Sequence, residues 1–491
     1  MFTQRNRLFF LGNFLVITMA LTTAQAKVVT YPAPAGLTAS PYYEVTVNGK
    51  SVFVYPITVA TIADETGKLR PDRHMIDIPA PAAMCYFDMT GPVKITVKVL
   101  DGAPQGPFQS VLVRPLRHAI RPVVKKNTLT FSLQDPAQLS VEPNGSVLAP
   151  LFIFANPPEK DRPKPNTPGL LYFGPGEHDL GVHEAKSNSK IYIAGGAVVY
   201  GQINGESVTN VQVTGRGILN GKRATQGRHQ RWFKSQNITI DGIIQLDSPS
   251  WGIKLLHSSD VFIHNVKIIN YRGACDAIDV CSSENVTVDG VFARTHDDTF
   301  NVKGLTDSHG HGYPADKDGN WLPDGNRRPS RNIRYLNSVI WNDRAHALMI
   351  GPETRATEIS DVLFRDIDII HALSVDVIGI FSSDSAPIRN IRYENIRIED
   401  PRVMTLFEIR AHPSYTTADK QMGPVSDVLF KNITVTTPSP LFSALCGDNA
   451  KIKGVTFDNL RINGVPMRSA EEMKLLIRGD VEDVRFVVPE K

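Results

Sequence analysis

An internal repeat of strand-length segments governs the last two thirds of this 491-residue sequence. Each copy starts with Asn, Asp or Gly, continues with Val or Ile, has an apolar or aromatic residue at the third position after the start, and has Gly, Asn or Asp at the fifth. Residues two apart face the same side of a strand, and Asn, Asp and Gly favour the turns that bracket it. The nine clear copies start at Asn210, Asn237, Asp260, Asn285, Asn332, Asp361, Asn390, Asp427 and Gly454, and a degenerate tenth starts at Asp483.

The spacing of the copies predicts stacked coils. Most steps are 23 to 29 residues long, and two are stretched to 47 and 37. One strand-and-turn unit per step is typical of a solenoid, so we expect an all-β protein in which residues 170–491 form a right-handed parallel β-helix of about ten coils. A leucine-rich repeat is the alternative, but its periodic leucines and its helices are missing. The stretched steps contain residues 304–331 and 410–423, and such insertions often decorate a binding face.

The sequence before the repeat predicts a second all-β domain. Residues 27–155 contain short segments in which apolar and polar side chains alternate, for example 43–47 and 93–97, and Asn48-Gly49 is a strong hairpin signal. This pattern favours a β-sandwich that either binds sugar, walls the active site or caps the structure. Residues 156–169 are rich in proline and charge and are predicted to be a linker.

The first 26 residues resemble a secretory signal peptide. A short basic region at Arg5 and Arg7 precedes a mostly apolar run, and Ala24-Gln25-Ala26 resembles a cleavage site. We therefore expect cleavage before Lys27 and a periplasmic or extracellular protein; a membrane anchor is the alternative, for which the apolar run is short. The net charge of +3 gives no indication of a nucleic-acid or membrane partner, and a monomer or small homo-oligomer is expected. The four cysteines are expected to be buried thiols: Cys85, Cys275, Cys281 and Cys446.

Carboxylates gather in two consecutive copies of the repeat. Asp297 and Asp298 follow Asp276 by 21 and 22 residues, nearly one coil, and His346 falls one coil further once the long insertion is set aside. Because coils stack about 4.8 Å apart, we expect Asp276, Asp297, Asp298 and His346 to line one groove. Acids this close raise each other's pKa, which is typical of acid–base chemistry. The alternative is that these Asp residues merely occupy turns, which suits an isolated Asp better than an adjacent pair.

Around these residues the sequence resembles the polygalacturonases of glycoside hydrolase family 28. The resemblance covers roughly residues 170–460 and includes Asn-Ile-Thr-Ile-Asp-Gly-Ile at 237–243. The family's Asn-Thr-Asp, Asp-Asp and Gly-His-Gly motifs are matched by residues 274–276, 297–298 and 345–347. This resemblance implies an inverting hydrolase in which Asp297 is the general acid, Asp276 and Asp298 hold the water, and His346 supports protonation of the acid.

Two departures from the family pattern bear on the substrate. Ala274 replaces the Asn of the first motif, and the Arg-Ile-Lys motif that grips a galacturonate carboxylate falls near Gly379-Ile380-Phe381, where it is absent. An uncharged wall cannot pair with a uronate. A β-sandwich followed by a β-helix is also similar to the family 49 dextranases, which use clustered Asp residues. We therefore predict a secreted glycoside hydrolase of a polysaccharide or oligosaccharide, for which a neutral or differently charged glycan is at least as suitable as pectin.

Two other functions remain open from the sequence. A polysaccharide lyase also uses β-helices, but needs a base that the clustered acids do not provide. A non-catalytic carbohydrate-binding β-helix needs no acid pair.

Other side chains near the predicted groove are candidates for substrate binding. Trp251 suits stacking on a sugar ring or, equally well, a packed corner. Residues 316–324 resemble a calcium loop but lack Gly at its sixth position, so we expect no cofactor, with calcium as the weaker alternative. No zinc spacing surrounds the two histidines of the long insertion. The candidates are Trp251, Asp279, Lys303, His309, His311, Arg344, Glu353 and Arg410.

Overall fold

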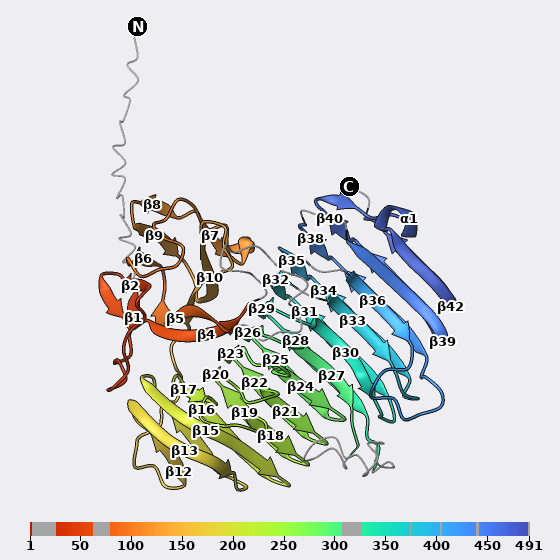
Figure 1. Cartoon of the computed structure of the whole chain (residues 1–491), viewed down its shortest axis with the longest axis horizontal. Coiled ribbons are helices and arrows are strands. Elements are labelled where there is room, and N and C mark those ends of the chain that lie inside the picture. Colours follow the sequence, from red (N-terminus) through yellow and green to blue (C-terminus); the bar gives the residue numbers. More distant parts are fainter. Residues whose placement is uncertain are drawn as a thin grey trace.

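The computed structural model describes residues 1, 26–61, 79–306, 326–373, 375–402, 405–437 and 441–489. Within these ranges the regular structure is almost entirely β, as the sequence predicts, and the exceptions are the short helices η2 (Leu116–His118) and α1 (Ala470–Met473). Figure 1 shows a compact β unit packed against the side of a long stack of parallel strands. No helix among the described residues combines the length and the apolar character needed to cross a membrane.

Two packed sheets form the N-terminal β unit. Their facing side chains, such as Val45, Val97, Phe87 and Ile153, are almost completely buried. The turn at Asn48-Gly49 joins two antiparallel strands, and both residues have positive φ (49° and 78°), as a type I′ hairpin requires. One sheet contains β1 (Lys27–Val29), β5 (Pro79–Thr90), β11 (Leu151–Asn156), β10 (Ala137–Pro143), β7 (Val111–Arg114) and, beside β5, β4 (Tyr55–Ala60). The other contains β3 (Lys50–Val52), β2 (Tyr43–Val47), β6 (Val93–Val99), β9 (Thr128–Leu133) and β8 (Val123–Lys125).

The rest of the chain is a right-handed parallel β-helix whose coils build three sheets. The first sheet contains every predicted repeat copy, and β12 and β14 extend it in front of the first copy. It consists of β12 (Leu170–Phe173), β14 (Lys190–Ile193), β16 (Thr209–Gly215), β19 (Gln236–Asp241), β22 (Ser259–His264), β25 (Glu284–Asp289), β28 (Ser330–Leu336), β31 (Ile359–Arg365), β34 (Ile388–Glu394), β37 (Val425–Lys431), β39 (Phe442–Asp458) and β42 (Leu475–Val487).

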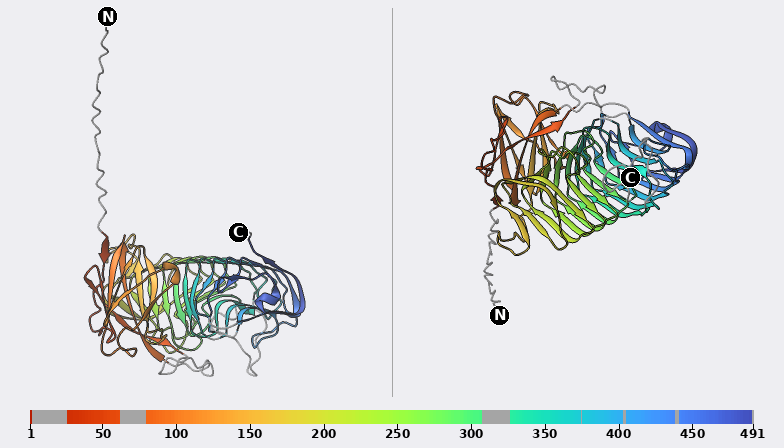
Figure 2. Two further views of the ribbon diagram at one scale, coloured as in Figure 1. Left: turned by 90° about the horizontal axis from the view of Figure 1, so that it is seen from above. Right: turned by 60° about the horizontal axis from the view of Figure 1, so that its bottom comes forward.

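Most coils contribute one strand to the second sheet and one to the third, and Figure 2 shows the stacked parallel strands from two further directions. The second contains β13 (Gly176–Glu184), β15 (Ala197–Glu206), β17 (Ile218–Asn220), β20 (Ile244–Leu246), β23 (Lys267–Ile269), β26 (Phe292–Thr295), β29 (Val339–Asn342), β32 (Asp368–Ala372), β35 (Arg397–Ile398), β38 (Thr434–Val435), β40 (Arg461–Ile462) and β41 (Val465–Pro466). The third runs from the end of β15 through β18 (Gln230–Phe233), β21 (Ile253–Leu256), β24 (Ile278–Cys281), β27 (Phe300–Gly304), β30 (His346–Thr354), β33 (Asp376–Ser382) and β36 (Thr405–Ala411) to β39 and β42.

The turn residues of the repeat form ladders on the outside of the first sheet. Starting residues such as Asn237 and Asn285 have φ of 54° and 56°, a left-handed conformation that Asn tolerates better than most residues. The Asn237 side-chain amide donates to Asn210 Oδ1 at 2.6 Å, and Asn332 donates to Asn285 Oδ1 at 2.8 Å. The repeat therefore specifies both the backbone of each turn and the contact between coils.

Inside the β-helix, the apolar position of the repeat changes from aliphatic to aromatic along the stack. The four earliest copies place Val or Ile there, whereas Tyr335, Phe364, Tyr393, Phe430 and Phe457 follow. Consecutive rings of these five stack with centroids 4.9–5.1 Å apart, about one coil spacing.

The N-terminal unit packs on the outer face of the second sheet. Phe152 lies 5.1 Å from Phe292 and 5.9 Å from Trp341, between ring centroids. The Arg294 guanidinium donates to the Ala60 carbonyl at 2.9 Å and pairs with Asp343 at 2.8 Å. The unit thus supports strands that end just before the turns carrying the clustered acids.

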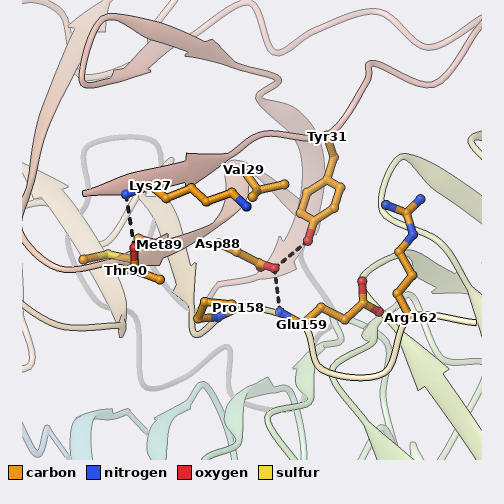
Figure 3. A pocket seen from close by; sticks show the side chains of 9 residues that line it. All are labelled: Lys27, Val29, Tyr31, Asp88, Met89, Thr90, Pro158, Glu159 and Arg162. Carbon is orange, nitrogen blue, oxygen red and sulfur yellow. Dashed lines mark hydrogen bonds between the residues drawn. The ribbon is translucent and has the colours of Figure 1, made fainter. Parts of the chain in front are cut away.

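The segment between the two parts runs beside a pocket of about 190 Å³ (Figure 3). Asp88 at this pocket accepts hydrogen bonds from the Tyr31 hydroxyl at 2.8 Å and from the Glu159 backbone N–H at 3.1 Å. Its other oxygen pairs with Arg216 of the β-helix at 3.3 Å. Asp88 therefore connects the N-terminal β unit, the segment that follows it and the β-helix, which indicates a structural role for this residue. The cysteines, all four of them, are buried free thiols as expected.

Candidate active site

The acids lie in turns that lead from the second sheet into the third. Asp276 precedes β24, Asp297 and Asp298 lie between β26 and β27, and His346 begins β30. These turns stack directly, because the Ala277 N–H donates to the Asp298 carbonyl at 3.1 Å and the Thr299 N–H donates to the His346 carbonyl at 2.9 Å. The chain bends at Asp297 instead of continuing as a strand, so adjacent side chains need not face opposite ways.

Lys303 lies at the centre of the acid cluster. Its Nζ is 3.0 Å from Asp276 Oδ2, 3.2 Å from Asp279 Oδ1, 3.7 Å from Glu353 Oε2 and 3.9 Å from Asp298 Oδ2, and its side chain is 3% exposed. Burial alone would lower the pKa of this ammonium, but Asp276, Glu353 and Asp279 together hold its pKa well above the usual value. Lys303 is therefore the positive charge that compensates these acids in space, although it is not adjacent to them in the sequence.

Asp276 and Asp279 form a buried acid pair. Asn301 Nδ2 donates to both, at 3.3 and 3.0 Å. Burial raises the pKa of both carboxyls, and the charge of Asp279 raises the pKa of Asp276 further, while Lys303 opposes the shift. The pair therefore retains a proton at a pH where an exposed Asp has lost its own.

Asp298 is held as an anion by His346. Its Oδ1 lies 2.6 Å from His346 Nδ1 and accepts the His346 backbone N–H at 3.2 Å. Burial would raise the pKa of Asp298, but the imidazolium and these hydrogen bonds hold its pKa below the usual value. In turn, burial opposes the charge on His346, while Asp298 raises the pKa of the imidazole to about 10.

Asp297 has the opposite tendency from its neighbour. Burial and then the Asp298 charge raise its pKa to about 6, while Arg344 opposes the shift. Its Oδ1 accepts the Asp298 backbone N–H at 3.1 Å, and its residue is partly exposed whereas Asp298 is buried. Below about pH 6 the two adjacent carboxyls thus differ in charge, with Asp297 protonated and Asp298 ionised, which is the arrangement that separates an acid from a base.

The remaining candidates lie in different surroundings. Trp251 is 5% exposed, with Lys303 Nζ 4.1 Å and the Arg228 guanidinium 4.9 Å from its ring centre, so the packed-corner interpretation is favoured over sugar stacking. Asp279, Lys303 and Glu353 are also buried, within the cluster. The charge of Arg344 opposes the rise in the pKa of Asp297.

His309, His311 and the calcium-like segment 316–324 lie outside the described residues. Among the residues that are described, no group of His, Cys, Asp or Glu side chains could hold a metal ion. Lys303 instead occupies the space between the acids that a cation would need.

Arg410 reaches the site from the coil after the expected substrate wall. It lies opposite Phe381 in the register of β33 and β36, with its guanidinium 3.5 Å from the centre of the Phe381 ring. Glu408 Oε1 is 3.5 Å from Arg410 Nη1, which satisfies part of its charge.

Several residues near the site were not found from the sequence: Asn301, Asp376, Glu408 and Tyr415. Asn301 could have been found, because it stacks in register with Asp279 two positions before Lys303. Tyr415 comes from the 410–423 insertion. Burial and then the charge of Glu353 raise the pKa of its hydroxyl, while Lys303 opposes the shift. Asp376 faces His346 from the next coil, and nothing in its local sequence marks it.

Solved structures with a similar fold include Dex49A from Penicillium minioluteum, which is 16% identical, with 91% of this chain and 90% of that chain covered and a TM-score of 0.51. A polygalacturonase from Erwinia carotovora ssp. carotovora is 18% identical (64% and 87% covered, TM-score 0.48), and a Family 28 exopolygalacturonase from Yersinia enterocolitica is 14% identical (94% and 96% covered, TM-score 0.47). At such identities the likeness shows the fold alone. The comparison with curated protein sequences gives no match.

A protein-family profile covers the part of the chain that carries the site. The profile described as "Glycosyl hydrolases family 28" matches residues 181–475, which is more than half of the chain. The matched region includes Asp276, Asp297, Asp298 and His346. The chain belongs to family 28 of the glycosyl hydrolases.

Proposed function

We propose that this glycoside hydrolase is exported and cleaves its glycan with inversion, using Asp297 as general acid and Asp298 as general base. The observation that carries the proposal is the unequal ionisation of these adjacent carboxyls. Burial and the charge of Asp298 keep a proton on Asp297, with its pKa at about 6, whereas His346 keeps Asp298 ionised. Cleavage of a glycosidic bond by two carboxyls needs one acid in each of these states, and inversion is proposed here because water, not Asp298, attacks the sugar.

In the proposed step, Asp297 gives its proton to the glycosidic oxygen as the bond from that oxygen to the anomeric carbon breaks. Water forms the new bond on the opposite face of the sugar, and Asp298 takes the proton that the water loses. Asp276 orients this water; because the Asp276–Asp279 pair retains a proton, it is a poorer base than Asp298. Buried Lys303 holds these acids together without contacting the sugar.

One argument against a lyase fails, but the structure still offers no base for one. The expectation that no base lies near the acids fails in space, because Lys303 is among them. However, burial is outweighed by Asp276, Glu353 and Asp279, which hold the pKa of Lys303 well above normal, so the ammonium does not take up a substrate proton. A non-catalytic binder would have no use for two adjacent carboxyls of which one is protonated and the other ionised.

For the substrate, we propose a neutral or modified glycan in preference to unmodified polygalacturonate. Residues 379–381 carry no cation, and Arg410 on the next coil is already paired with Glu408 and stacked on Phe381. A uronate carboxylate would have to compete with Glu408 for this guanidinium.

The test is a panel of neutral and acidic polysaccharides, assayed for new reducing ends and for the absorbance of unsaturated sugars. We expect reducing ends without that absorbance, lost in Asp297→Asn. Unsaturated products would instead support a lyase, and binding that Asp297→Asn leaves unchanged, without any cleavage, would support a binder. Efficient cleavage of unmodified polygalacturonate would contradict the substrate proposal alone.

A further inference from the structure

His346 has a carboxylate at each of its ring nitrogens. Nδ1 lies 2.6 Å from Asp298 Oδ1, and Nε2 lies 3.3 Å from Asp376 Oδ2. The His346 side chain is 13% exposed and that of Asp376 is 1% exposed. Because β30 pairs with β33 so that His346 is opposite Asp376, the two side chains belong to adjacent coils. The imidazole is therefore enclosed between two acids from different coils.

Glu408 adds a second acid behind Asp376. It lies on β36, opposite Gly379 of β33, and hydrogen-bonds to Asp376. A Cβ atom at Gly379 would lie 2.8 Å from Met349 Sδ and 3.4 Å from His346 Cδ2. The absence of a side chain at Gly379 thus lets Met349 and His346 pack closely against this strand.

The charges around this pair follow from burial and contact. Burial and then the charge of Asp376 raise the pKa of Glu408, while Arg410 opposes the shift. Glu408 therefore keeps its proton to a higher pH than an exposed Glu does, and behind His346 it backs Asp376, whose Oδ2 faces His346 Nε2 at 3.3 Å. On the opposite side, Asp298 faces Nδ1 of His346, and Lys303 Nζ lies 3.9 Å from Asp298 Oδ2. Arg344 opposes the rise in the pKa of Asp297.

We infer that Asp376 and Glu408 are positioning residues: together they hold His346 as an imidazolium, which keeps Asp298 ionised to receive the proton of the attacking water. During the reaction the water O–H bond breaks, its proton goes to Asp298, and Asp297 protonates the leaving oxygen. His346 keeps both of its ring protons throughout. The role of Asp298 rests on the proposed function, whereas the charge state of His346 does not.

The experiment is an NMR titration of the full chain labelled with 13C-histidine, with the His346 signal assigned by its loss in His346→Gln. An opposite charge within 4–6 Å changes a pKa by about 1–3 pH units, so Asp376→Asn should lower the titration midpoint of His346 by at least about one unit. Glu408→Gln should leave the midpoint nearly unchanged, because its amide also donates to Asp376. Asp366→Asn is the matched control, since Asn fills the equivalent position of several other repeats.

A readout of catalysis separates positioning from simple damage. In Asp376→Asn the acid limb of the kcat/KM profile should stay in place, because His346 is still protonated there, whereas the decline at alkaline pH should steepen at a lower pH, where His346 loses its proton. A general structural loss would lower the rate at every pH. An unchanged His346 midpoint in Asp376→Asn would overturn the inference.

If Asp376→Asn does not fold, Asp376→Ser replaces it: a His346 midpoint equal to that of the unsubstituted protein would overturn the inference, and one lower by at least about one unit would support it. If no glycan is cleaved, the proposed function fails, but the titration still decides this inference.

Discussion

The β-helix stacks side chains in two contrasting ways on two of its faces. On the first sheet, uncharged Asn side chains such as Asn237 and Asn210 bond to one another from coil to coil. Along the third sheet, the stacked positions collect Asp276, Asp298 and other acids around Lys303. The spacing between coils is the same on both faces. Stacked amides can donate hydrogen bonds to one another, whereas stacked carboxylates need cations and shared protons to offset their repulsion.

This difference separates stability from chemistry. The amide ladder recurs over many coils, because an Asn amide can donate to the Asn or Asp oxygen of the preceding coil. The acid cluster is confined to a few coils, and each member has a different pKa because its neighbours differ. Substitutions in the two regions should therefore have different signatures.

The largest effect is expected from Asp297→Asn, which removes the proton donor. General acid catalysis contributes roughly 10²–10⁴-fold, so kcat should fall by about that factor on an unactivated glycoside. A substrate whose leaving group needs no proton should lose far less. Steady-state kinetics on both substrates measure the difference, and equal losses on the two would remove Asp297 from the acid role.

Lys303→Met should give the largest loss of stability. Removing one partner of a buried ion pair costs about 3–5 kcal/mol, because the acids around it are left uncompensated. Urea unfolding measures this loss, which should shrink as the pH falls through the raised pKa values of Asp276 and Asp279 and these carboxyls take up protons. Lys98→Met is the control, since its pair with Glu44 is exposed (47% and 61%) and should cost at most about 1 kcal/mol.

The pH profile should report the protonated Asp297. With a raised pKa of about 6, this carboxyl loses its proton as the pH rises, so kcat/KM should fall about tenfold per pH unit above that value. The acid limb should lie well below it, because Asp298 has a lowered pKa. A profile that stays flat to pH 8 would be inconsistent with Asp297 as the acid of the free enzyme.

The smallest effect is expected in the amide ladder. Asn395 donates to Asp366 at 3.0 Å, accepts from Asn432 at 3.0 Å and has φ of 56°. Asn395→Ala should cost about 1–2 kcal/mol through the left-handed backbone, in addition to the lost hydrogen bonds. Asn395→Gly, which keeps the backbone relaxed, should cost less, and neither should change kcat. A drop in kcat would show that the two faces are coupled.

The sequence predicts most of the fold because the repeat encodes it locally. A turn residue at each end and alternating apolar positions between them recur at the coil period, so all ten predicted copies lie in the first sheet. Strands β12 and β14 are missed because their turns lack this pattern. The hairpin at Asn48-Gly49 is likewise local and predictable.

The site is less accessible to this reasoning because its contacts cross coils of unequal length. Asp276, the Asp297–Asp298 pair and His346 are identified by spacing and motif. That Lys303 compensates four acids depends on which strands pair, and Asp376 and Glu408 resemble ordinary turn or surface acids until the register places them beside His346. The change of substrate wall at Gly379 can be read from the sequence, but the close packing of Met349 and His346 against this glycine cannot.

The stereochemistry of the first-formed product tests the unequal acid pair most directly. Proton NMR of a glycan during the first minutes of cleavage, before the sugar equilibrates, distinguishes the anomers. With Asp297 as acid and Asp298 as base, one displacement by water gives a product of inverted configuration. A product of retained configuration would contradict the account, because one of these aspartates would then have formed a covalent bond to the sugar.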